Sequence, residues 1–350
     1  MAPFGKGLKI LRHQGLSAFT WKVLRYTPIW YLVWNTVTSR APVGTNIYER
    51  DWDLLIILDA CRVDSLQRFS DSKPYLDDIQ SIQSVGSMSA EWMLKTFTGE
   101  YRDQIAETAH LSGNIWSYRI LEEQFHRHRM DASEQDYLYD GWPHWQTLSA
   151  DEFGYYEMIW TDVDEDRLHP QNAAIPHILT DRAIDIGREK DFDRLIVHYT
   201  LPHIPFIADA LDWEPGEMST SELMDGLDHT REITPTEEAP YEGTKWNEES
   251  TDTVKKGFEK NLELVLEYVE ILLSNFEAED VVISADHGEA LGEYGLWGHP
   301  FGFPLSPVKT VPWAKTTASD ERTYETQYDT TRMVPHREEQ IEFLEQMGYL

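Results

Sequence analysis

The sequence has very little cysteine and a marked shortage of positive charge. Cys61 is the single cysteine in 350 residues, which excludes a disulfide framework and a cysteine-rich zinc module. Lys and Arg number 30 against 62 Asp and Glu, so the formal net charge is −32. Because a field of this sign repels phosphate backbones, we do not expect the protein to bind nucleic acid.

The acidic residues are spread along the chain, which indicates a surface that stays hydrated in concentrated salt. Screening by such salt removes the repulsion between like charges. An acidic protein from an ordinary environment is the alternative. Disorder is not expected, because 41% of the residues are apolar and 13 Trp, 17 Tyr and 13 Phe need a core. The length allows one large domain or two modest ones.

The N-terminal segment, residues 1–48, lacks Asp and Glu altogether. It holds six Lys and Arg, so it carries +6 of the total −32 and leaves −38 for residues 49–350. Its longest apolar stretch, residues 28–34, is too short to span a bilayer, and the segment lacks the layout of a signal peptide. Basic residues mixed with aromatic ones predict a helical arm, of which residues 1–40 contact an anionic membrane surface. The alternative is an arm packed on its own acidic domain. We expect a cytoplasmic protein that can lie at the inner face of the membrane.

Strands and helices are predicted to alternate after this arm. Residues 53–58, 194–197 and 281–283 are short apolar runs, typical of parallel strands covered on both faces. Apolar residues three or four apart predict an amphipathic helix over residues 254–276. The expected fold is α/β, with a mainly parallel central sheet flanked by helices. Residues 219–253 are polar and contain prolines, and we predict a long exposed insertion loop there.

Ionisable side chains follow each of these three strands. Asp59 follows the first, His198 and His203 follow the second, and Asp286 and His287 follow the third. Ligands of open α/β sheets lie beyond the carboxyl ends of the strands, so these groups are expected at one rim. Carboxylates with imidazoles suit Mn²⁺ or Zn²⁺, whereas an all-oxygen shell would favour Ca²⁺ or Mg²⁺. We expect one divalent metal ion, which would let an acidic protein accept an anionic ester substrate.

Three segments resemble a known family. The segment from Asp286-His-Gly-Glu to His299-Pro is similar to the carboxyl-terminal metal motif of the alkaline phosphatase superfamily, in its branch of sulfatases and phosphoglycerol or phosphoethanolamine transferases. Asp59-Ala-Cys-Arg-Val-Asp64 resembles the first motif of the phosphodiesterase and phosphonate-hydrolase members, and His198-Tyr-Thr-Leu-Pro-His203 resembles a third family segment. The resemblance covers residues 52–350 in order. It implies that residues 49–350 form a sulfatase-like catalytic domain, and the acidic surface points to a halophilic archaeon as the source.

The resemblance also implies roles for particular residues. Asp59, Asp286 and His287 would bind the metal. Counting back from Thr98-Gly99 places Ser89 at the nucleophile position, at the start of a helix where it could be the N-cap, with Ser87 in reserve. The alternative for Ser89 is a purely structural capping serine. Substrate oxygens would be bound, or the leaving group protonated, by His198, His203 and His299. The charge that develops in the transition state would be stabilised by Arg62 or Lys309.

These features favour a metal-dependent hydrolase of phosphate or sulfate esters, with a serine nucleophile and a glycan or lipid-linked substrate. Formylglycine formation is not expected, because the residues after Ser89 lack the Pro/Ala and Arg that it requires. A transferase that moves a phospho-headgroup to a glycan or lipid is the second interpretation. A catalytically inactive binding protein of the same fold is the third.

Overall fold

The apolar runs in the middle of the chain assemble into one large sheet. The computed structural model describes residues 28–124, 144–159, 176–190, 192–204, 206–210, 248–293 and 297–326. Within these ranges the chain forms a seven-stranded sheet in the order β2-β9-β6-β1-β5-β3-β4 and a two-stranded sheet of β7 and β8. The predicted α/β fold with a mainly parallel sheet is therefore confirmed.

The strands of the large sheet are β1 (Leu54–Asp59), β2 (Asp78–Gln83), β3 (Thr108–Ser112), β4 (Tyr155–Met158), β5 (Arg194–Pro202), β6 (Ala278–Ser284) and β9 (Thr310–Ala318). The small sheet consists of β7 (Ala290–Leu291) and β8 (Trp297–Gly298). The helices are α2 (Pro28–Thr38), α3 (Val63–Leu66), α4 (Ser89–Thr96), α5 (Arg102–Ala106), α6 (Ile115–Ser117), α7 (Pro176–Glu189), α8 (Ile207–Ala210), α11 (Glu248–Leu273) and α12 (Ser306–Lys309). Shorter 3-10 or π turns occupy Ile47–Glu49, Gln67–Phe69, Pro74–Leu76, Gly99–Tyr101, Tyr118–Glu122 and Ala150–Glu152.

Strand β1 lies at the centre of the parallel part of the sheet. Leu54 pairs with Leu195 of β5 on one side and with Val281 of β6 on the other, both in parallel. Every residue of β1 is buried, as expected for a parallel strand that is covered on both faces. Beyond β6, strand β9 is antiparallel to β6, and β2 is antiparallel to β9. The three strands predicted from the sequence are thus adjacent in space.

Several predicted boundaries differ from the structure, and those of β5 and α11 differ most. Strand β5 runs on to Pro202, so His198 lies within the strand rather than after it. The pairing between β1 and β5 shifts at its end, where Leu58 faces Tyr199 but Asp59 faces Pro202. Helix α11 begins at Glu248, so residues 248–253 are helical and not the end of a loop. The rest of the predicted insertion, residues 219–247, lies outside the described residues.

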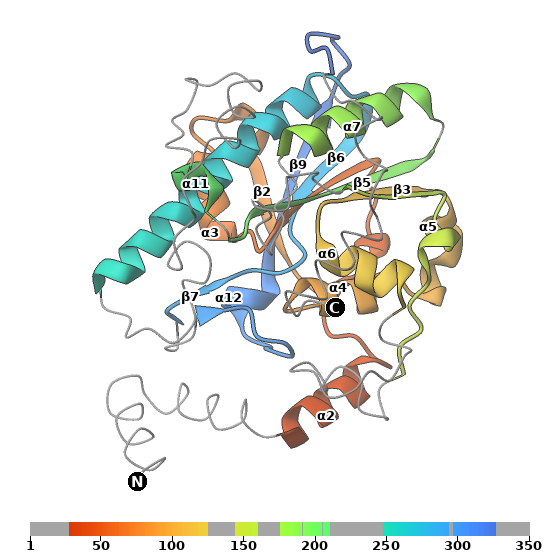
Figure 1. Ribbon diagram of the computed structural model, residues 1–350, viewed down its shortest axis with the longest axis vertical. Helices are drawn as coiled ribbons and strands as arrows, with labels where there is room; N and C mark the ends of the chain where they lie inside the picture. Colours follow the sequence, from red (N-terminus) through yellow and green to blue (C-terminus); the bar gives the residue numbers. More distant parts are fainter. Residues whose placement is uncertain are drawn as a thin grey trace, which may run out of the picture.

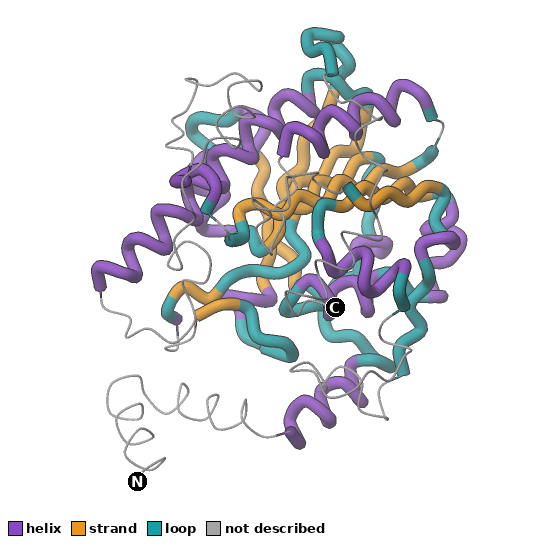
Figure 2. The backbone as a smooth tube through the Cα atoms, in the orientation of Figure 1, coloured by secondary structure: helices purple, strands orange, loops and turns teal. Residues whose placement is uncertain are grey.

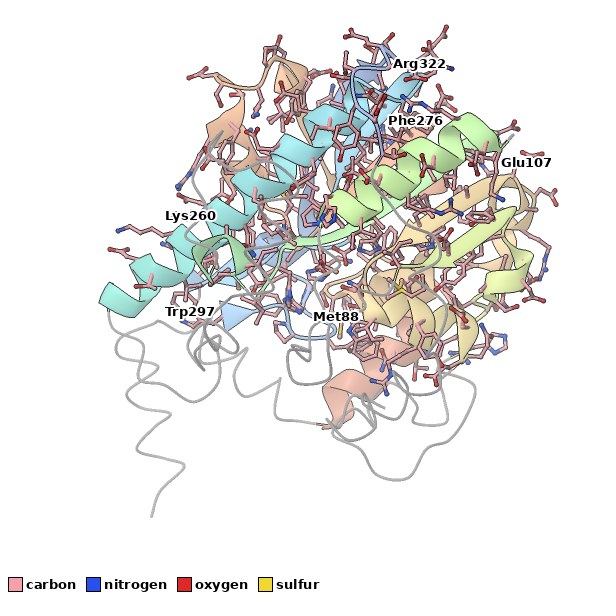
Figure 3. All side chains as sticks on the ribbon, turned by 45° about the horizontal axis from the view of Figure 1, so that its top comes forward. Met88, Glu107, Lys260, Phe276, Trp297 and Arg322 are labelled. Atoms are coloured by element: carbon pink, nitrogen blue, oxygen red, sulfur yellow. The ribbon has the colours of Figure 1, made fainter. Side chains whose placement is uncertain are left out.

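Helices α7 and α11 pack side by side over the sheet (Figure 1). The apolar stripe of α11 faces this sheet, and Phe258, Leu262, Val265 and Val269 are all buried, which confirms the predicted amphipathic helix. In the view of Figure 2, α4, α12 and α2 lie below the strands. Met88, next to α4, and Trp297, on β8, lie at this end of the molecule, whereas Phe276 and Arg322 lie at the opposite end (Figure 3). The carboxyl ends of β1, β5 and β6 therefore open toward the end that carries α4.

Residues 28–48 of the predicted N-terminal arm are described, and α2 forms the first half of them. It lies next to the end that carries α4 (Figure 1). The earlier residues, 1–27, are outside the described residues, as is the C-terminal segment 327–350. Among the helices that the structure describes, none combines the length and the apolar character needed to cross a bilayer.

Candidate metal centre and nucleophile

Two neighbouring strands deliver the acidic side chains of the site. Strand β1 ends at Asp59, and Asp286 and His287 come just after the end of β6. Because β1 and β6 are parallel partners, these residues reach the same edge of the sheet. The ligand atoms of Asp59, Asp286 and His287 all lie within 4.8 Å of one another, and all three residues are buried. The structure thus brings the three predicted metal ligands together.

The local backbone directs one oxygen of each carboxylate into this cluster. Asp286 Oδ1 accepts hydrogen bonds from the N–H groups of His287 (2.9 Å) and Ala60 (3.2 Å). Ala60 reaches it from a left-handed conformation, φ 64°, which costs a non-glycine residue about 1–2 kcal/mol. Asn114 Nδ2 donates to Asp59 Oδ2 at 2.8 Å. Among the described residues, nothing donates a hydrogen bond to the remaining oxygens, Asp59 Oδ1 and Asp286 Oδ2.

The ring of His287 completes the cluster. Its Nδ1 lies 2.9 Å from the carbonyl of Gly288, which makes Nδ1 a donor and turns Nε2 toward the cluster. Nε2 is 3.3 Å from Asp59 Oδ1 and 3.4 Å from Asp286 Oδ2. Burial alone would lower the pKa of His287, but the negative charges of Asp286 and Asp59 outweigh it and raise this pKa to about 10. The reciprocal effect of His287 holds the pKa of Asp286 well below its usual range despite burial.

This donor set fits a divalent cation. Two buried carboxylate oxygens without hydrogen-bond donors and an imidazole lone pair repel one another unless a positive charge lies between them. A proton on His287 meets that need in the absence of metal. Carboxylate and imidazole ligands together are a set that Zn²⁺ and Mn²⁺ accept. The residues present therefore fit the predicted metal, whose identity stays a prediction.

The predicted nucleophile lies beside the cluster. Ser89 is buried, and its Oγ is 3.3 Å from His287 Nε2 and accepts a hydrogen bond from Asn114 Nδ2 at 3.0 Å. Ser89 is the first residue of α4, and the N-cap is Met88, so the expectation that Ser89 caps the helix is wrong. The reason is that its hydroxyl turns to Asn114 and His287 rather than to the amides of the first turn.

The turn before Ser89 is fixed to the end of β6. The hydroxyl of Ser84 donates to the backbone carbonyl of Asp286. Gly86 packs on the backbone of Trp92, where a Cβ atom would approach the Trp92 nitrogen to 2.4 Å. Ser87, the reserve nucleophile, is directed elsewhere, because its Oγ lies 2.6 Å from Glu91 Oε2. Of the two candidate serines, only Ser89 has a hydrogen bond or close contact to the metal-ligand cluster among the described residues.

A second group of ligand-type residues lies next to the first. His203, Glu289 and His299 have ligand atoms within 4.8 Å of one another. The His299 ring is 4.4 Å from that of His287 and 4.9 Å from that of His203, between ring centroids. His299 Nδ1 is 2.8 Å from Glu289 Oε2, and His203 Nδ1 is 2.7 Å from the carbonyl of Ile204. Burial lowers the pKa of His203, an effect that Asp59 partly opposes, so this ring is uncharged at neutral pH.

Other residues singled out from the sequence have different neighbours. The Arg62 guanidinium is paired with Asp64 and Glu293, each at 2.8 Å, and donates to the carbonyl of Glu289. Arg62 therefore joins the loop after β1 to the loop after β6, and a direct catalytic role for it stays a prediction. Lys309 Nζ donates to the carbonyl of Val43 at 3.0 Å.

His198 approaches the cluster from within β5. Its Nε2 lies 3.7 Å from Asp286 Oδ2, and among the described residues neither ring nitrogen makes a hydrogen bond. The ring stacks with that of His110 on β3, with centroids 6.2 Å apart. Substrate binding by His198 stays a prediction.

Two residues of the site were missed by the sequence analysis. Asn114 contacts both Ser89 and Asp59, and it follows β3, whose residues Thr-Ala-His-Leu-Ser give no continuous apolar run. Glu289 stands in the quoted motif, but no role was assigned to it. The available signal was the order of elements, because a polar residue directly after any parallel strand reaches the same edge of the sheet.

Comparison with known proteins gives structural neighbours but no sequence relatives. No protein-family model matches the chain. No curated protein matches it in sequence.

Among solved structures, the soluble domain of lipooligosaccharide phosphoethanolamine transferase A from Neisseria meningitidis shares 16% identity, with a TM-score of 0.40 over 79% of this chain and 80% of that one. The periplasmic domain of EcEptC from Escherichia coli, in complex with Zn, shares 10% identity, with a TM-score of 0.40 over 79% and 76%. BT1596, a 2-O GAG sulfatase, shares 14% identity, with a TM-score of 0.33 over 77% and 64%. The solved structures that this chain is similar to thus include phosphoethanolamine transferases and sulfatases.

Proposed function

We propose that the protein is a metal-dependent hydrolase of phosphate or sulfate esters that uses Ser89 as its nucleophile. One observation carries the proposal. A buried serine hydroxyl lies 3.3 Å from His287 Nε2, at the edge of a cluster with two buried carboxylate oxygens that accept no hydrogen bond from the described residues. A purely structural role for Ser89 would not explain why two buried carboxylates and an imidazole converge beside it and need a positive charge among them.

The residues of the cluster and its neighbours have different roles in the proposed reaction. A divalent cation held by Asp59, Asp286 and His287 would neutralise the negative charge of the ester and favour the ionised form of the serine. Asn114 donates to Ser89 Oγ and to Asp59, so it fixes the direction of the oxygen that attacks. The helix dipole of α4, with Ser89 at its first position, adds partial positive charge at this oxygen.

The reaction takes two steps. The hydroxyl proton of Ser89 passes to water, its Oγ forms a bond to phosphorus or sulfur, and the bond to the leaving oxygen breaks. The leaving oxygen takes the proton of His299 Nε2. Glu289 lies 2.8 Å from the opposite nitrogen of this ring and fixes the orientation of the ring. Water then attacks the seryl ester and gives a proton back to His299, and Ser89 is released with its own proton restored.

The second group of ligand-type residues is proposed to bind the ester rather than a second metal. Its carboxylate, Glu289, is already hydrogen-bonded to His299, and His203 is uncharged and can donate or accept a hydrogen bond. The first cluster has two carboxylates for one imidazole and needs the cation more. We therefore expect one tightly bound metal ion per chain, Mn²⁺ or Zn²⁺ rather than Ca²⁺ or Mg²⁺.

The experiment is a substrate screen in high salt with added metal, using aryl phosphate monoesters and diesters, aryl sulfates and aryl phosphonates. Ser89→Ala is expected to lower turnover by on the order of 10³-fold or more. Ser87→Ala tests the reserve nucleophile, and Ser65→Ala, a buried serine on α3, is the matched control. A wild-type rate that survives in Ser89→Ala would refute the mechanism.

Metal binding is measured separately, by calorimetric titration with Zn²⁺ and Mn²⁺. Asp286→Asn keeps the shape of the side chain but removes one charge, and it is expected to weaken binding by 10- to 100-fold, on the order of what loss of a ligating group or its support costs. A stoichiometry of one supports the assignment. A second equivalent that disappears in His203→Ala would instead give the second group a metal. Absence of any binding would refute the metal-dependent mechanism.

A transferase of a phospho-headgroup is the second candidate. Val33, Val37 and Val43 are the exposed large apolar residues of the described chain, and all lie on α2 or just after it. Together with the six basic residues of positions 1–48, they favour contact of residues 1–40 with an anionic membrane, where lipid-linked acceptors lie. We place this contact at the inner face of the membrane. Product analysis with an added alcohol or glycan acceptor decides, because a hydrolase passes the group to water even when the acceptor is present.

A further inference from the structure

A second buried charged network lies beneath the nucleophile helix, with Glu91 at its centre. Glu91 stands two residues after Ser89 on α4 and is 0% exposed. Its Oε2 accepts the N–H and the hydroxyl of Ser87, at 2.8 and 2.6 Å, and the N–H of Gly302 at 3.3 Å. Its Oε1 accepts the indole N–H of Trp34 at 2.6 Å and is paired with the ammonium of Lys95. One carboxylate thus joins segments that are far apart in the sequence.

Two of these segments carry residues of the proposed active site. Ser87 belongs to the turn that leads into Ser89, and the Ser87 Oγ also accepts the N–H of Phe303 at 3.1 Å. It lies 3.1 Å from the carbonyl of Pro300, the residue after His299. Through Ser87 and Gly302, Glu91 therefore fixes the turn before the nucleophile against the segment that follows the proposed general acid. Neither contact involves a metal ligand.

The third segment is α2, outside the catalytic sheet. Trp34 packs so closely on Gly302 that a Cβ atom there would approach Trp34 Cδ1 to 2.8 Å, and Gly302 has a φ of 66°. The Lys95 ammonium lies 5.3 Å from the centre of the Trp34 ring. Helix α2 thus reaches the network with an indole that contacts both α4 and the 299–303 segment.

The charge of Glu91 suits this arrangement. A carboxylate offers only acceptors, so it can receive all of these donors at once, whereas an amide would direct N–H groups against some of them. Burial would raise the pKa of Glu91, but the charges of Lys95 and Lys309 outweigh it and lower this pKa to about 2. Glu91 therefore stays ionised over the physiological range.

We propose that Glu91 is a positioning residue that sets Ser89 relative to His299, and that Trp34 of α2 completes its hydrogen bonds. This inference rests on the proposed role of Ser89 as nucleophile. Full activity then requires that α2 is packed on this network, although α2 contributes no group that touches the substrate. Glu91 makes no hydrogen bond to Asp59, Asp286 or His287 among the described residues, so metal binding is expected to be independent of the network.

The test uses the full chain with Trp34→Phe, which keeps the ring but removes the N–H donor. Trp52→Phe is the matched control, because Trp52 is buried and donates its indole N–H to the carbonyl of Ile47 at 3.0 Å, away from Glu91. Hydrogen–deuterium exchange is expected to rise in Trp34→Phe in peptides covering residues 86–93 and 299–304. Trp52→Phe should leave both peptides unchanged.

Kinetics on the aryl ester that the wild type turns over supply the second readout. Trp34→Phe and Glu91→Gln are expected to lower kcat by on the order of 10- to 100-fold with little change in KM, since a nucleophile displaced by about 1 Å reacts that much more slowly. Zn²⁺ affinity should equal that of the wild type in Trp34→Phe. A loss of Zn²⁺ affinity equal to the loss of kcat would mean general unfolding and would overturn the proposal.

The two proposals fail in different ways. If exchange in residues 86–93 and 299–304 is the same in Trp34→Phe and Trp52→Phe, the positioning network is wrong, whatever the activity. Exchange can rise in Trp34→Phe as expected while the wild type turns over none of the esters. The network then stands as a structural unit, and the proposed function is wrong. If Trp34→Phe raises exchange but keeps the wild-type kcat, Glu91 does not position Ser89.

Discussion

The three histidines nearest the proposed reaction share one orientation. In His287, His299 and His203, Nδ1 faces a fixed acceptor, which is the Gly288 carbonyl, the Glu289 carboxylate or the Ile204 carbonyl. Each ring therefore presents Nε2 to the site. Metal-binding and catalytic histidines are oriented in the same way, by a partner on the opposite ring nitrogen. The acceptors differ in charge, because His299 faces a carboxylate whereas His203 faces a backbone carbonyl, and burial lowers the pKa of His203.

At the same scale, Lys309 is expected to destabilise the fold below neutral pH. Burial lowers its pKa from 10.5 to about 7, and the nearby Lys95 adds to this, although Glu91 opposes it. Below the pKa of the folded state, Lys309 is protonated in both the folded and the unfolded chain. The folded state then bears the full free-energy cost of the buried charge. Between about 7 and 10.5 the unfolded chain binds more protons, so stability rises with pH.

Lys309→Met, which retains the length of the side chain, is accordingly expected to stabilise the protein by about 1–4 kcal/mol below neutral pH. The gain should shrink as pH rises above about 7. Thermal unfolding of the variant and the wild type, measured across this range, checks the effect. Lys315→Met, at an exposed position of the adjacent β9, is the matched control and should show no such pH dependence. An equal gain at every pH would contradict the argument.

At the scale of elements, α2 has two different sides. Trp34 contacts the body, whereas Val33 and Val37 are 51% and 54% exposed. A helix that is anchored on one side and apolar on the other is suited to contact with a lipid surface. The basic residues of the N-terminal segment supply the attraction to anionic headgroups.

The double variant Val33→Ser with Val37→Ser is therefore expected to bind vesicles of anionic phosphatidylglycerol more weakly, by on the order of tenfold. Co-sedimentation measures it, with neutral phosphatidylcholine vesicles as the lipid control. Unchanged thermal unfolding would show that the inner side of α2 is still in place. Equal binding of variant and wild type would exclude α2 as the contact, and the arm would then be a structural one.

The elements also show how far the sequence could lead. Strands β1, β5 and β6 are apolar runs buried on both faces, so their pattern predicted them and placed Asp59, Asp286 and His287 together. Strand β3 is buried but carries Thr, His and Ser, because its neighbours are other polar and aromatic side chains, and Asn114 was missed with it. The contacts of Arg62 with Glu293 and of Trp34 with Glu91 join residues distant in sequence, and no local pattern predicts them.

At the scale of the whole molecule, charge is distributed unevenly. Residues 1–48 carry +6 of the total −32, and residues 49–350 carry −38. Part of this negative charge is locally compensated, as in the pairs of Lys73 with Glu267 and Glu270 and of Arg188 with Asp320. With 30 basic against 62 acidic residues, pairing each basic residue with one carboxylate would leave 32 carboxylates over. Their mutual repulsion favours expanded states of the chain in dilute buffer.

Salt is expected to stabilise the protein strongly, because the distribution of acidic residues predicts a surface adapted to concentrated salt. The Debye length falls from about 10 Å at 0.1 M to about 3 Å at 1 M, so exposed charges farther apart than this are largely screened. The melting temperature should therefore rise steeply as KCl increases from about 0.1 M to about 1 M, by on the order of 10 °C for a few kcal/mol. Scanning calorimetry over this range measures it. Sucrose at matched osmolality is the control, because it strengthens burial without screening charge. A melting temperature that rises equally in sucrose and in KCl would mean that charge repulsion does not limit the fold, and the acidic surface would then reflect solubility alone.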